Sequence, residues 1–460
     1  MKRVIKNILF LLKSLLPSKY QLPKILLQQY QFLQESKKWD LKHLREYQWH
    51  ELKKLLNYAY CNSPYYKKLF SEHSINLNHI KNFKDFSQKV PILSKNEIRH
   101  NLERLVTLPK NKLARTTTGG TIGKPLEFYL EKNVTYNKTL AFEWRHYNSG
   151  GYFFNDKIVT LRGNTIKDNI YEHHKEKHCL FLSAFDMTKE NMHKYVKLIE
   201  KYQPKYIAAY ASAAEILANF VSEYYPYFNK NGQIKSLFAT SETLYDYQKN
   251  IIEKAFNLKV FDKYGNSEQC TIIGQCQLRK YHDYMEYSYS EFLDENNEEV
   301  KNGQARLVST SFVNYATPFI RYETGDIVEI ERNDKCDCGM QHTVIKRIIG
   351  REKETIIDKK GNEIALGPIL FGIHDQDWGR IKRIQFVQDK MGYLILKVVS
   401  NEKEEWIYKY IKSLFDRRLT LFEYKIKIVN DIKLTGVGKH KYLIQNLNLK
   451  DITNKQIYQR

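Results

Sequence analysis

IKSLFATSETLYDYQKNIIEKAFNLKVFDKYGNSE, residues 234–268, contains the pattern on which the fold prediction rests. Its two ends, residues 234–242 and 258–268, are apolar runs rich in β-branched and aromatic side chains, which predict two strands. The stretch between them, residues 243–256, is typical of a helix. Alternation of strand and helix predicts an α/β fold in which helices cover a layered sheet.

The same alternation continues through the middle of the chain. Further predicted elements are the strands DKIVTLRG (156–163), KYIAAYAS (205–212) and QARLVSTSF (304–312), and the helix SAAEILANFVSEYY (212–225). Ligands of α/β proteins bind beyond the carboxyl ends of the strands. Polar residues stand at two of these ends, in SET (241–243) and YGNSE (264–268). We therefore expect the functional site at this edge of the sheet.

The flanking regions predict further units. Residues 25–110 look helical, with breaks at Ser63-Pro64 and Val90-Pro91, and the C-terminal part contains a strand-like run (392–400) before a helix (404–419). Two dipeptides that begin with glycine, Gly325-Asp326 and Gly350-Arg351, are each expected in a tight turn. The predicted organisation is an amphipathic helical extension (1–44), a large α/β domain (45–350) and a small separate C-terminal α+β domain (351–460).

Composition and charge narrow the classes of partner. The 460 residues include 74 basic and 52 acidic side chains, a formal net charge of +22, which favours anionic partners. No basic block is long enough for a nucleic-acid arm, so we expect no nucleic-acid partner. Six cysteines are too few for a disulfide scaffold and indicate a reduced, cytoplasmic protein.

Residues 1–20 have the pattern of a basic amphipathic helix. This segment is too short and too charged to span a membrane, and no small-residue cleavage site follows it. It either rests on the inner membrane face as a peripheral contact or packs against the protein itself.

The loop RTTTGGTIGKPLEFY, residues 115–129, groups threonine hydroxyls, glycine amides and an ammonium, which suit phosphate oxygens. It is not a P-loop, because Gly119 and Gly123 are only four apart and Pro125 follows Lys124. The stretch is therefore either a different triphosphate loop or a polar hairpin.

The order of the motifs is more specific than any one of them. TTTGGT-x-GKP (116–125) is followed by YGNSE (264–268), YETGD (322–326), GREKE (350–354) and GVGK (436–439). In this order they resemble the adenylate-forming superfamily of acyl- and aryl-CoA synthetases. The resemblance is greatest to its phenylacetate–CoA ligase-like branch, which includes CapK-type members encoded in capsule and O-antigen polysaccharide clusters.

The resemblance implies ATP-dependent conversion of a carboxylic acid to an acyl-adenylate, followed by transfer to coenzyme A or another acyl acceptor. It implies a large N-terminal domain and a small C-terminal domain that rotates. Mg²⁺ would accompany ATP. Ile122 and Lys353 depart from the pattern, because relatives often have threonine and aspartate there.

The resemblance also gives individual residues their roles. Lys439 would act in catalysis with Thr116 and Lys124, and Lys441 is its nearby competitor. Glu268 would bind Mg²⁺, and Lys353 lies at the expected hinge. The other residues of the set would contact the nucleotide. The phosphates would be contacted by Thr117, Thr118, Gly119, Gly120 and Thr121. The adenine would be contacted by Ser241, Glu242, Thr243, Tyr264 and Gly265, and the ribose by Asp326 and Arg351.

Four side chains could hold a structural zinc ion: Cys276, His282, Cys336 and Cys338. The alternative is a group of reduced cysteines in tight turns. Candidates for the wall around the acid are Tyr210, Ala211 and Phe238, but the sequence does not identify the acid.

Two other classes of function remain open at this point. The first is a non-catalytic relative that acts as a scaffold in a membrane-associated polysaccharide assembly. The second is a basic, zinc-containing nucleic-acid binder, which only the net charge and the C-x-C pair Cys336 and Cys338 support.

Overall fold

The structure is a computed structural model. It describes residues 22–118, 126–162, 169–174, 178–184, 187–244, 246–331, 336–351, 355–359, 361, 363–366, 381–416, 419–433 and 441–447. In these ranges no helix combines the length and the apolar character that crossing a bilayer requires. The predicted helix at residues 1–20 lies outside them.

Helices form the first part of the described chain, as predicted. They are α3 (Lys24–Ser36), α4 (Leu41–Asn62), α5 (Pro64–Glu72), α6 (Phe83–Lys89) and α7 (Lys95–Leu105). Short polar side chains begin four of them: Asp40, Ser63, Asn82 and Ser94 each accept a hydrogen bond from a first-turn amide. Pro64 occupies the first turn of α5, where its missing N–H costs nothing.

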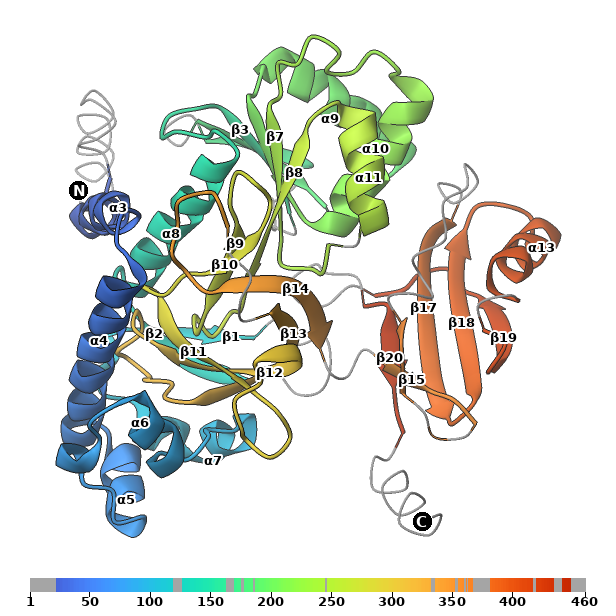
Figure 1. The fold of residues 1–460 in the computed structure, drawn as a ribbon. Coiled ribbons are helices and arrows are strands. Elements are labelled where there is room, and N and C mark those ends of the chain that lie inside the picture. Colours follow the sequence, from blue (N-terminus) through green and yellow to red (C-terminus); the bar gives the residue numbers. More distant parts are fainter. Residues whose placement is uncertain are drawn as a thin grey trace, which may run out of the picture.

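The central part of the chain is a parallel sheet covered on both faces. Its parallel strands are β3 (Ile158–Arg162), β5 (Cys179–Ser183), β6 (Tyr206–Ala209), β7 (Ser236–Thr240) and β8 (Lys259–Gly265), with β4 (Tyr171–His174) antiparallel at the edge. Helices α9 (Lys189–Tyr202), α10 (Ala211–Tyr224) and α11 (Asp246–Phe256) lie on one face (Figure 1). Helix α8 (Thr135–Ser149) covers the other face, together with α3. The predicted α/β layering is confirmed.

The sheet continues through antiparallel strands to a total of twelve, in the order β11-β12-β13-β14-β10-β9-β8-β7-β6-β3-β5-β4. The added strands are β9 (Ile272–Gln275), β10 (Tyr281–Asp283), β11 (Ser288–Leu293), β12 (Asn302–Ser311), β13 (Tyr322–Glu331) and β14 (Val344–Arg351). A separate hairpin, β1 (Leu113–Thr117) with β2 (Glu127–Glu131), carries the threonine-rich stretch.

The C-terminal part has its own sheet and its own core. Strands β17 (Ile381–Lys390), β18 (Tyr393–Ser400), β19 (Glu423–Ile428) and β20 (Leu443–Gln445) pair in the order β19-β18-β17-β20. Helix α13 (Glu404–Phe415) packs on them, and a small hairpin of β15 (Thr355–Ile357) and β16 (Glu363–Ala365) precedes them. Figure 1 shows this sheet standing apart from the large one. The domain boundaries at residues 44 and 350 stay predictions.

Two expected turns are instead parts of strands. Gly325 and Asp326 lie within β13, and Gly350 and Arg351 end β14. Both glycines have positive φ (74° and 103°), at irregular positions of the ladders that β13 forms with β12 and β14. Such irregularities bend a strand without ending it. The C-terminal helix also ends earlier than expected, at Phe415 rather than 419.

Candidate functional site

Residues from two strand ends meet at the carboxyl edge of the parallel sheet. Ser241, Glu242 and Thr243 directly follow β7, and Tyr264 and Gly265 end its parallel neighbour β8. Ser241 has a positive φ of 69°, which is unfavourable for a residue with a side chain. The chain therefore turns sharply at the end of β7, at the edge where α/β proteins bind ligands.

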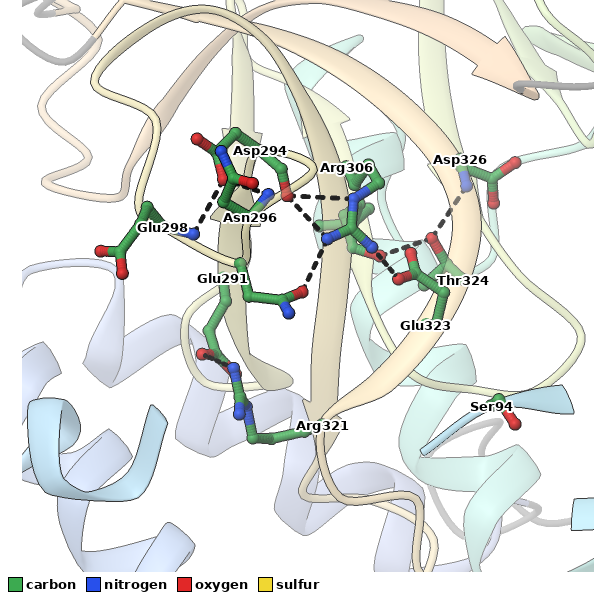
Figure 2. Close-up of polar contacts among 12 residues, drawn as sticks. Ser94, Glu291, Asp294, Asn296, Glu298, Arg306, Arg321, Glu323, Thr324 and Asp326 are labelled. Atoms are coloured by element: carbon green, nitrogen blue, oxygen red, sulfur yellow. Dashed lines mark hydrogen bonds and ion pairs between the residues drawn. The ribbon is translucent and has the colours of Figure 1, made fainter. Parts of the chain in front are cut away.

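A bulge in β13 brings Asp326 to the same place. Arg306 pairs with Ile327 and Val308 with Glu323, so residues 324–326 stand opposite Leu307 alone. The Thr324 hydroxyl accepts a hydrogen bond from the Asp326 amide (3.1 Å) and donates to the Leu307 carbonyl (2.7 Å). Figure 2 shows Asp326 beside Thr324 on this curved strand. The bulge fixes the position of the Asp326 carboxylate.

Ion pairs hold the start of the same strand. Arg306 contacts the Glu323 carboxylate and also donates to the Asp294 carbonyl (2.7 Å). Arg321 pairs with Glu291, 2.9 Å between Nε and Oε2, with both side chains buried (Figure 2). Arginines that hold two acceptors at once restrict the backbone at the beginning of the YETGD motif.

Tyr264 and Asp326 are in direct contact although 62 residues separate them. The Tyr264 hydroxyl donates to Asp326 Oδ2 at 2.6 Å. Burial and the neighbouring Asp326 carboxylate raise the pKa of Tyr264 well above its usual value, so its hydroxyl remains a donor. Two of the motifs expected to form one site are thus brought together.

The GREKE motif reaches this place through the β13–β14 ladder. Asp326 pairs with Arg351, and Ile327 pairs with Gly350. A Cβ atom on Gly350 would lie 3.1 Å from the Thr243 hydroxyl, so this close approach favours glycine. The backbones of the SET, YETGD and GREKE motifs therefore converge.

Lys95 is a residue of this region that the sequence analysis did not single out. It begins α7, and its ammonium donates to the Thr324 carbonyl at 2.7 Å. A Cβ on Gly325 would lie 3.4 Å from the same ammonium. The sequence around it, residues 90–99, contains the capping box of Ser94 and Glu97 that begins α7.

Glu268 lies just beyond β8 and is almost completely buried. Its Oε1 atom accepts a hydrogen bond from the Tyr322 hydroxyl at 2.7 Å. The charges of Asp326 and Glu268 both raise the pKa of Tyr264. A carboxylate is a suitable ligand for Mg²⁺.

The threonine-rich stretch is the end of a hairpin. Thr116 and Thr117 pair with Phe128 and Glu127 of β2. The Thr118 hydroxyl accepts from the Leu126 amide at 2.9 Å, so it closes the base of the loop. The remaining predicted residues of this loop, Gly119, Gly120, Thr121 and Lys124, lie outside the described residues, as do Lys353 and Lys439. For Arg351 only the backbone is described.

Glu242 caps a helix at this edge. Its Oε2 atom accepts from the Ser212 amide in the first turn of α10, at 2.9 Å. One turn further on, Glu215 is buried and accepts from the Gln248 amide group at 2.7 Å. Burial raises the pKa of Glu215 to about 7, and the charge of Glu242 adds to this shift.

The predicted zinc ligands do come together. The ligand atoms of Cys276, His282, Cys336 and Cys338 all lie within 4.8 Å of one another. The sulfurs of Cys276 and Cys336 are 3.6 Å apart, and the Cys338 sulfur lies 3.4 Å from His282 Nε2. Ligands around a tetrahedral zinc ion lie about 3.5–3.8 Å apart, given Zn–S bonds of about 2.3 Å and Zn–N bonds of about 2.0 Å. The donor set and its spacing fit zinc.

Cys276 follows β9, and His282 lies in β10, so a hairpin presents these two ligands. No disulfide links the six cysteines. Behind the cluster, buried Arg145 and His342 contact the carboxylate of Glu286, at 2.8 Å and 3.1 Å.

The expected wall residues differ in their exposure. Ala211 and Phe238 are completely buried within the packed sheet and helices. Phe238 stacks on Tyr147 of helix α8 with 4.4 Å between ring centroids, so it belongs to the packed layer between the sheet and this helix. Only Tyr210 retains some exposed surface.

Comparisons with known proteins agree with this arrangement. The CapK C-terminal domain family matches residues 356–446, which contain the second sheet. The chain is 26% identical over 417 residues to protein CapK of Staphylococcus aureus, covering 88% of this chain and 90% of that protein. It is 24% identical over 342 residues to phenylacetate–coenzyme A ligase of Thermus thermophilus, covering 68% and 72%.

A solved structure shares the fold over nearly the whole chain. It is that of 2-hydroxyisobutyryl-CoA ligase in the postadenylation state, in complex with R3-HIB-AMP. The TM-score is 0.68 at 16% identity, and the match covers 92% of this chain and 94% of that one.

Proposed function

We infer that this chain, which belongs to the adenylate-forming superfamily and to its phenylacetate–CoA ligase-like branch, activates a carboxylic acid with ATP. The carboxylate attacks the α-phosphorus, an acyl–oxygen–phosphorus bond forms, and pyrophosphate leaves as the bond between the α- and β-phosphates breaks. In the second half-reaction the thiol of coenzyme A attacks the acyl carbonyl and AMP leaves. Catalysis of such a displacement is mainly positioning and neutralisation of charge.

The contact between Tyr264 and Asp326 carries this proposal. Asp326 would accept the ribose hydroxyls, since a carboxylate has acceptor sites beyond the one that Tyr264 uses. The ring of Tyr264 would stack on adenine, and residues 241–243 would frame the base. Arg351, paired with Asp326 in the ladder, would assist at the ribose.

The phosphates would lie between the β1–β2 loop and Glu268. Thr116, Thr117 and the loop up to Lys124 would donate to the departing pyrophosphate, while Thr118 holds the loop base closed. Glu268 would bind Mg²⁺, which usually takes one or two protein carboxylates together with phosphate oxygens. Mg²⁺ would neutralise phosphate charge.

Lys439 would reach the acyl-phosphate oxygens when the C-terminal domain rotates. The separate sheet and separate core of that domain support a rigid-body movement. Lys353 lies in the segment between the two sheets and is the proposed hinge.

Zinc bound by Cys276, His282, Cys336 and Cys338 would be structural. Four protein ligands fill a tetrahedral ion, so no position is left for a substrate. The ion would tie the β9–β10 hairpin to the segment at residues 336–338. Elemental analysis of protein purified without chelator should show one zinc per chain, and its absence would remove this proposal.

The similarity to protein CapK supports a role in capsule or O-antigen polysaccharide biosynthesis. The activated acyl group would then be destined for a sugar, with coenzyme A as carrier. The basic segment at residues 1–20 would bring the enzyme to the inner membrane face.

Pyrophosphate release from ATP and Mg²⁺, measured across aryl, short acyl, hydroxy and amino acids, tests the function. Release that depends on one acid, without coenzyme A, would establish adenylation. Stimulation by coenzyme A would identify the acceptor. ATP binding without release from any acid would favour the scaffold alternative.

A further inference from the structure

Four neighbouring strands place one residue each in a row at the carboxyl edge. Leu161, Ala209, Ala239 and Asp262 pair in register across β3, β6, β7 and β8. The residues that follow them are therefore also level with one another: Arg162, Tyr210, Thr240 and Lys263. We call these four residues the polar row. Residues in register on parallel strands point to the same face.

Helix α8 supplies partners to the two basic members of the polar row. Glu143 accepts from the Lys263 ammonium at 2.8 Å, and the Tyr147 hydroxyl accepts from Arg162 at 3.0 Å. Glu143 and Tyr147 are four residues apart and so share one face of the helix. The polar row therefore faces α8, while the next residue along β8, Tyr264, points to the opposite face and contacts Asp326.

The polar row carries an excess of positive charge. Burial raises the pKa of Glu143, but Lys263 and Arg162 more than offset this, so the pKa is lowered and the carboxylate stays ionised. One anion thus stands against two cations. His146 adds no charge, because burial and Lys263 lower its pKa to about 3. In the described part of the chain, buried Nε of Arg162 has no hydrogen-bond partner.

The layer beneath the polar row leaves no space for a large apolar group. Phe238 and Phe261, two residues before Thr240 and Lys263, are buried. A Cβ on Gly150 would lie 2.6 Å from the Phe238 ring, so helix and sheet are in close contact there. An acyl group beside the polar row can therefore be only small.

An apolar acid would be disfavoured at this place. It would exclude water from Arg162 and Lys263 without replacing the lost hydrogen bonds, and a buried polar group without a partner is destabilising. A site lined with donors discriminates strongly against a substrate that lacks the matching acceptor.

We propose that the acid this enzyme activates is small and carries a second oxygen-bearing group, a hydroxyl or another carboxylate, which accepts hydrogen bonds from Arg162. This inference rests on the proposed function and names its substrate class. Arg162 is the specificity-determining residue, and Lys263, held by Glu143, supports it. Phenylacetate is then a poor substrate despite the similarity to phenylacetate–CoA ligases.

The test compares matched acids by pyrophosphate release: butyrate, 3-hydroxybutyrate, succinate and phenylacetate. We expect kcat/KM for 3-hydroxybutyrate or succinate to exceed that for butyrate and phenylacetate by about 10²-fold. Preference for 3-hydroxybutyrate would identify the second group as a hydroxyl, and preference for succinate would identify it as a carboxylate.

Variants assign the preference to Arg162. Arg162→Met should reduce the ratio of kcat/KM for 3-hydroxybutyrate or succinate to kcat/KM for butyrate at least tenfold. The change should arise mainly in KM for the acid, with KM for ATP unchanged. Arg162→Lys should retain part of the ratio. Lys205→Met, which removes a charge at the opposite, amino-terminal end of β6, should leave the ratio as it is.

Equal or better use of phenylacetate or butyrate would overturn the inference and leave the proposed adenylation intact. A ratio unaffected by Arg162→Met in folded protein would overturn the assignment of Arg162. Absence of release with every acid, together with absence of ATP binding, would overturn the proposed function and the inference with it.

Discussion

Two polar clusters lie at opposite ends of the short strand β9, and they differ in how their side chains are engaged. Beyond its last residue, three cysteines and one histidine converge, each offering one ligand atom to a common centre. Beside its first residue, the end of β8 carries Tyr264, which contacts Asp326 at the carboxyl edge. The ligand atoms of the cysteine–histidine cluster face one another, whereas the groups at the carboxyl edge are the ones that we propose bind the nucleotide.

The difference shows in the local strain and protonation. The carboxyl edge holds Ser241 in an unfavourable backbone conformation and Glu215 with its pKa raised to about 7. Such features lower stability and collect at functional sites. We therefore expect changes at the cysteine–histidine cluster to alter stability, and changes at the carboxyl edge to alter activity.

The largest effect should come from Lys439, which we propose reaches the carboxyl edge when the C-terminal domain rotates. Lys439→Ala should lower the rate of adenylate formation about 10³-fold, because a charge that stabilises the transition state is lost. ATP binding should persist, as measured by calorimetry. Lys441→Ala is the matched control, and an equal loss in that variant would contradict the choice of Lys439.

The second effect concerns the contribution of the cysteine–histidine cluster to stability. Cys336→Ser should lower the free energy of unfolding by about 3 kcal/mol, since a zinc ligand is lost. The kcat of the folded fraction should change little. Urea unfolding with zinc analysis measures this, and exposed Cys61→Ser serves as the control. A selective loss of kcat with unchanged stability would break the distinction between the two clusters.

Asp326→Ala should reduce kcat/KM for ATP about 10²-fold, because two charge-assisted hydrogen bonds are worth about 3 kcal/mol together. Stability should fall much less than activity. Glu329→Gln, on the same strand but paired with Lys346 at the surface, should leave the kinetics unchanged. Unaltered nucleotide binding in Asp326→Ala would mean that the YETGD match is accidental.

Glu215→Gln should stabilise the protein at alkaline pH. Between about pH 4.5 and 7 the native state retains a proton that the unfolded state has released, so the wild-type protein loses stability as the pH rises through that window. Glutamine cannot ionise, and we expect a gain of about 2 kcal/mol at pH 8 and almost none near pH 4.5.

Urea unfolding at several pH values measures this gain. The exposed helix residue Glu200, changed to glutamine, is the control. A gain that does not depend on pH would show that the buried charge is not its cause.

The smallest effect concerns one hydrogen bond. Tyr264→Phe removes the donor to Asp326 but keeps the ring, so KM for ATP should rise about fivefold, or about 1 kcal/mol, with kcat nearly constant. Tyr281→Phe removes an equivalent bond, to Asp262 (2.7 Å), that the proposed nucleotide contacts do not include, and it should leave KM unchanged.

Much of this architecture was predictable from local sequence. The strands and helices of the parallel sheet follow their apolar runs, and the four zinc-ligand candidates were identifiable because thiols and imidazoles are few. The motif order also placed Tyr264 and Asp326 in one site. A short stretch of sequence contains each strand or helix in full, whereas the zinc ligands were grouped by residue type and the motifs by resemblance.

Other features depend on pairing that no single stretch reveals. A glycine followed by a polar residue predicts a turn at Gly325 and at Gly350. Only the ladders of β13 with β12 and β14 show that both glycines lie within strands. Arg162 and Lys263 were missed since each is one of many basic residues. Their importance follows from the register of four strands and from their partners on α8.

The N-terminal helices have a further consequence for synthesis on the ribosome. Ser36 contacts Glu286, Gln48 contacts the Ser288 carbonyl, and Tyr66 contacts the Pro318 carbonyl, 250, 240 and 252 residues later in the chain. At translation rates of about 5–20 residues per second, these helices wait on the order of 10 to 50 seconds for their partners. During that interval their apolar faces are unprotected, so the nascent chain should depend on chaperones until the antiparallel strands emerge.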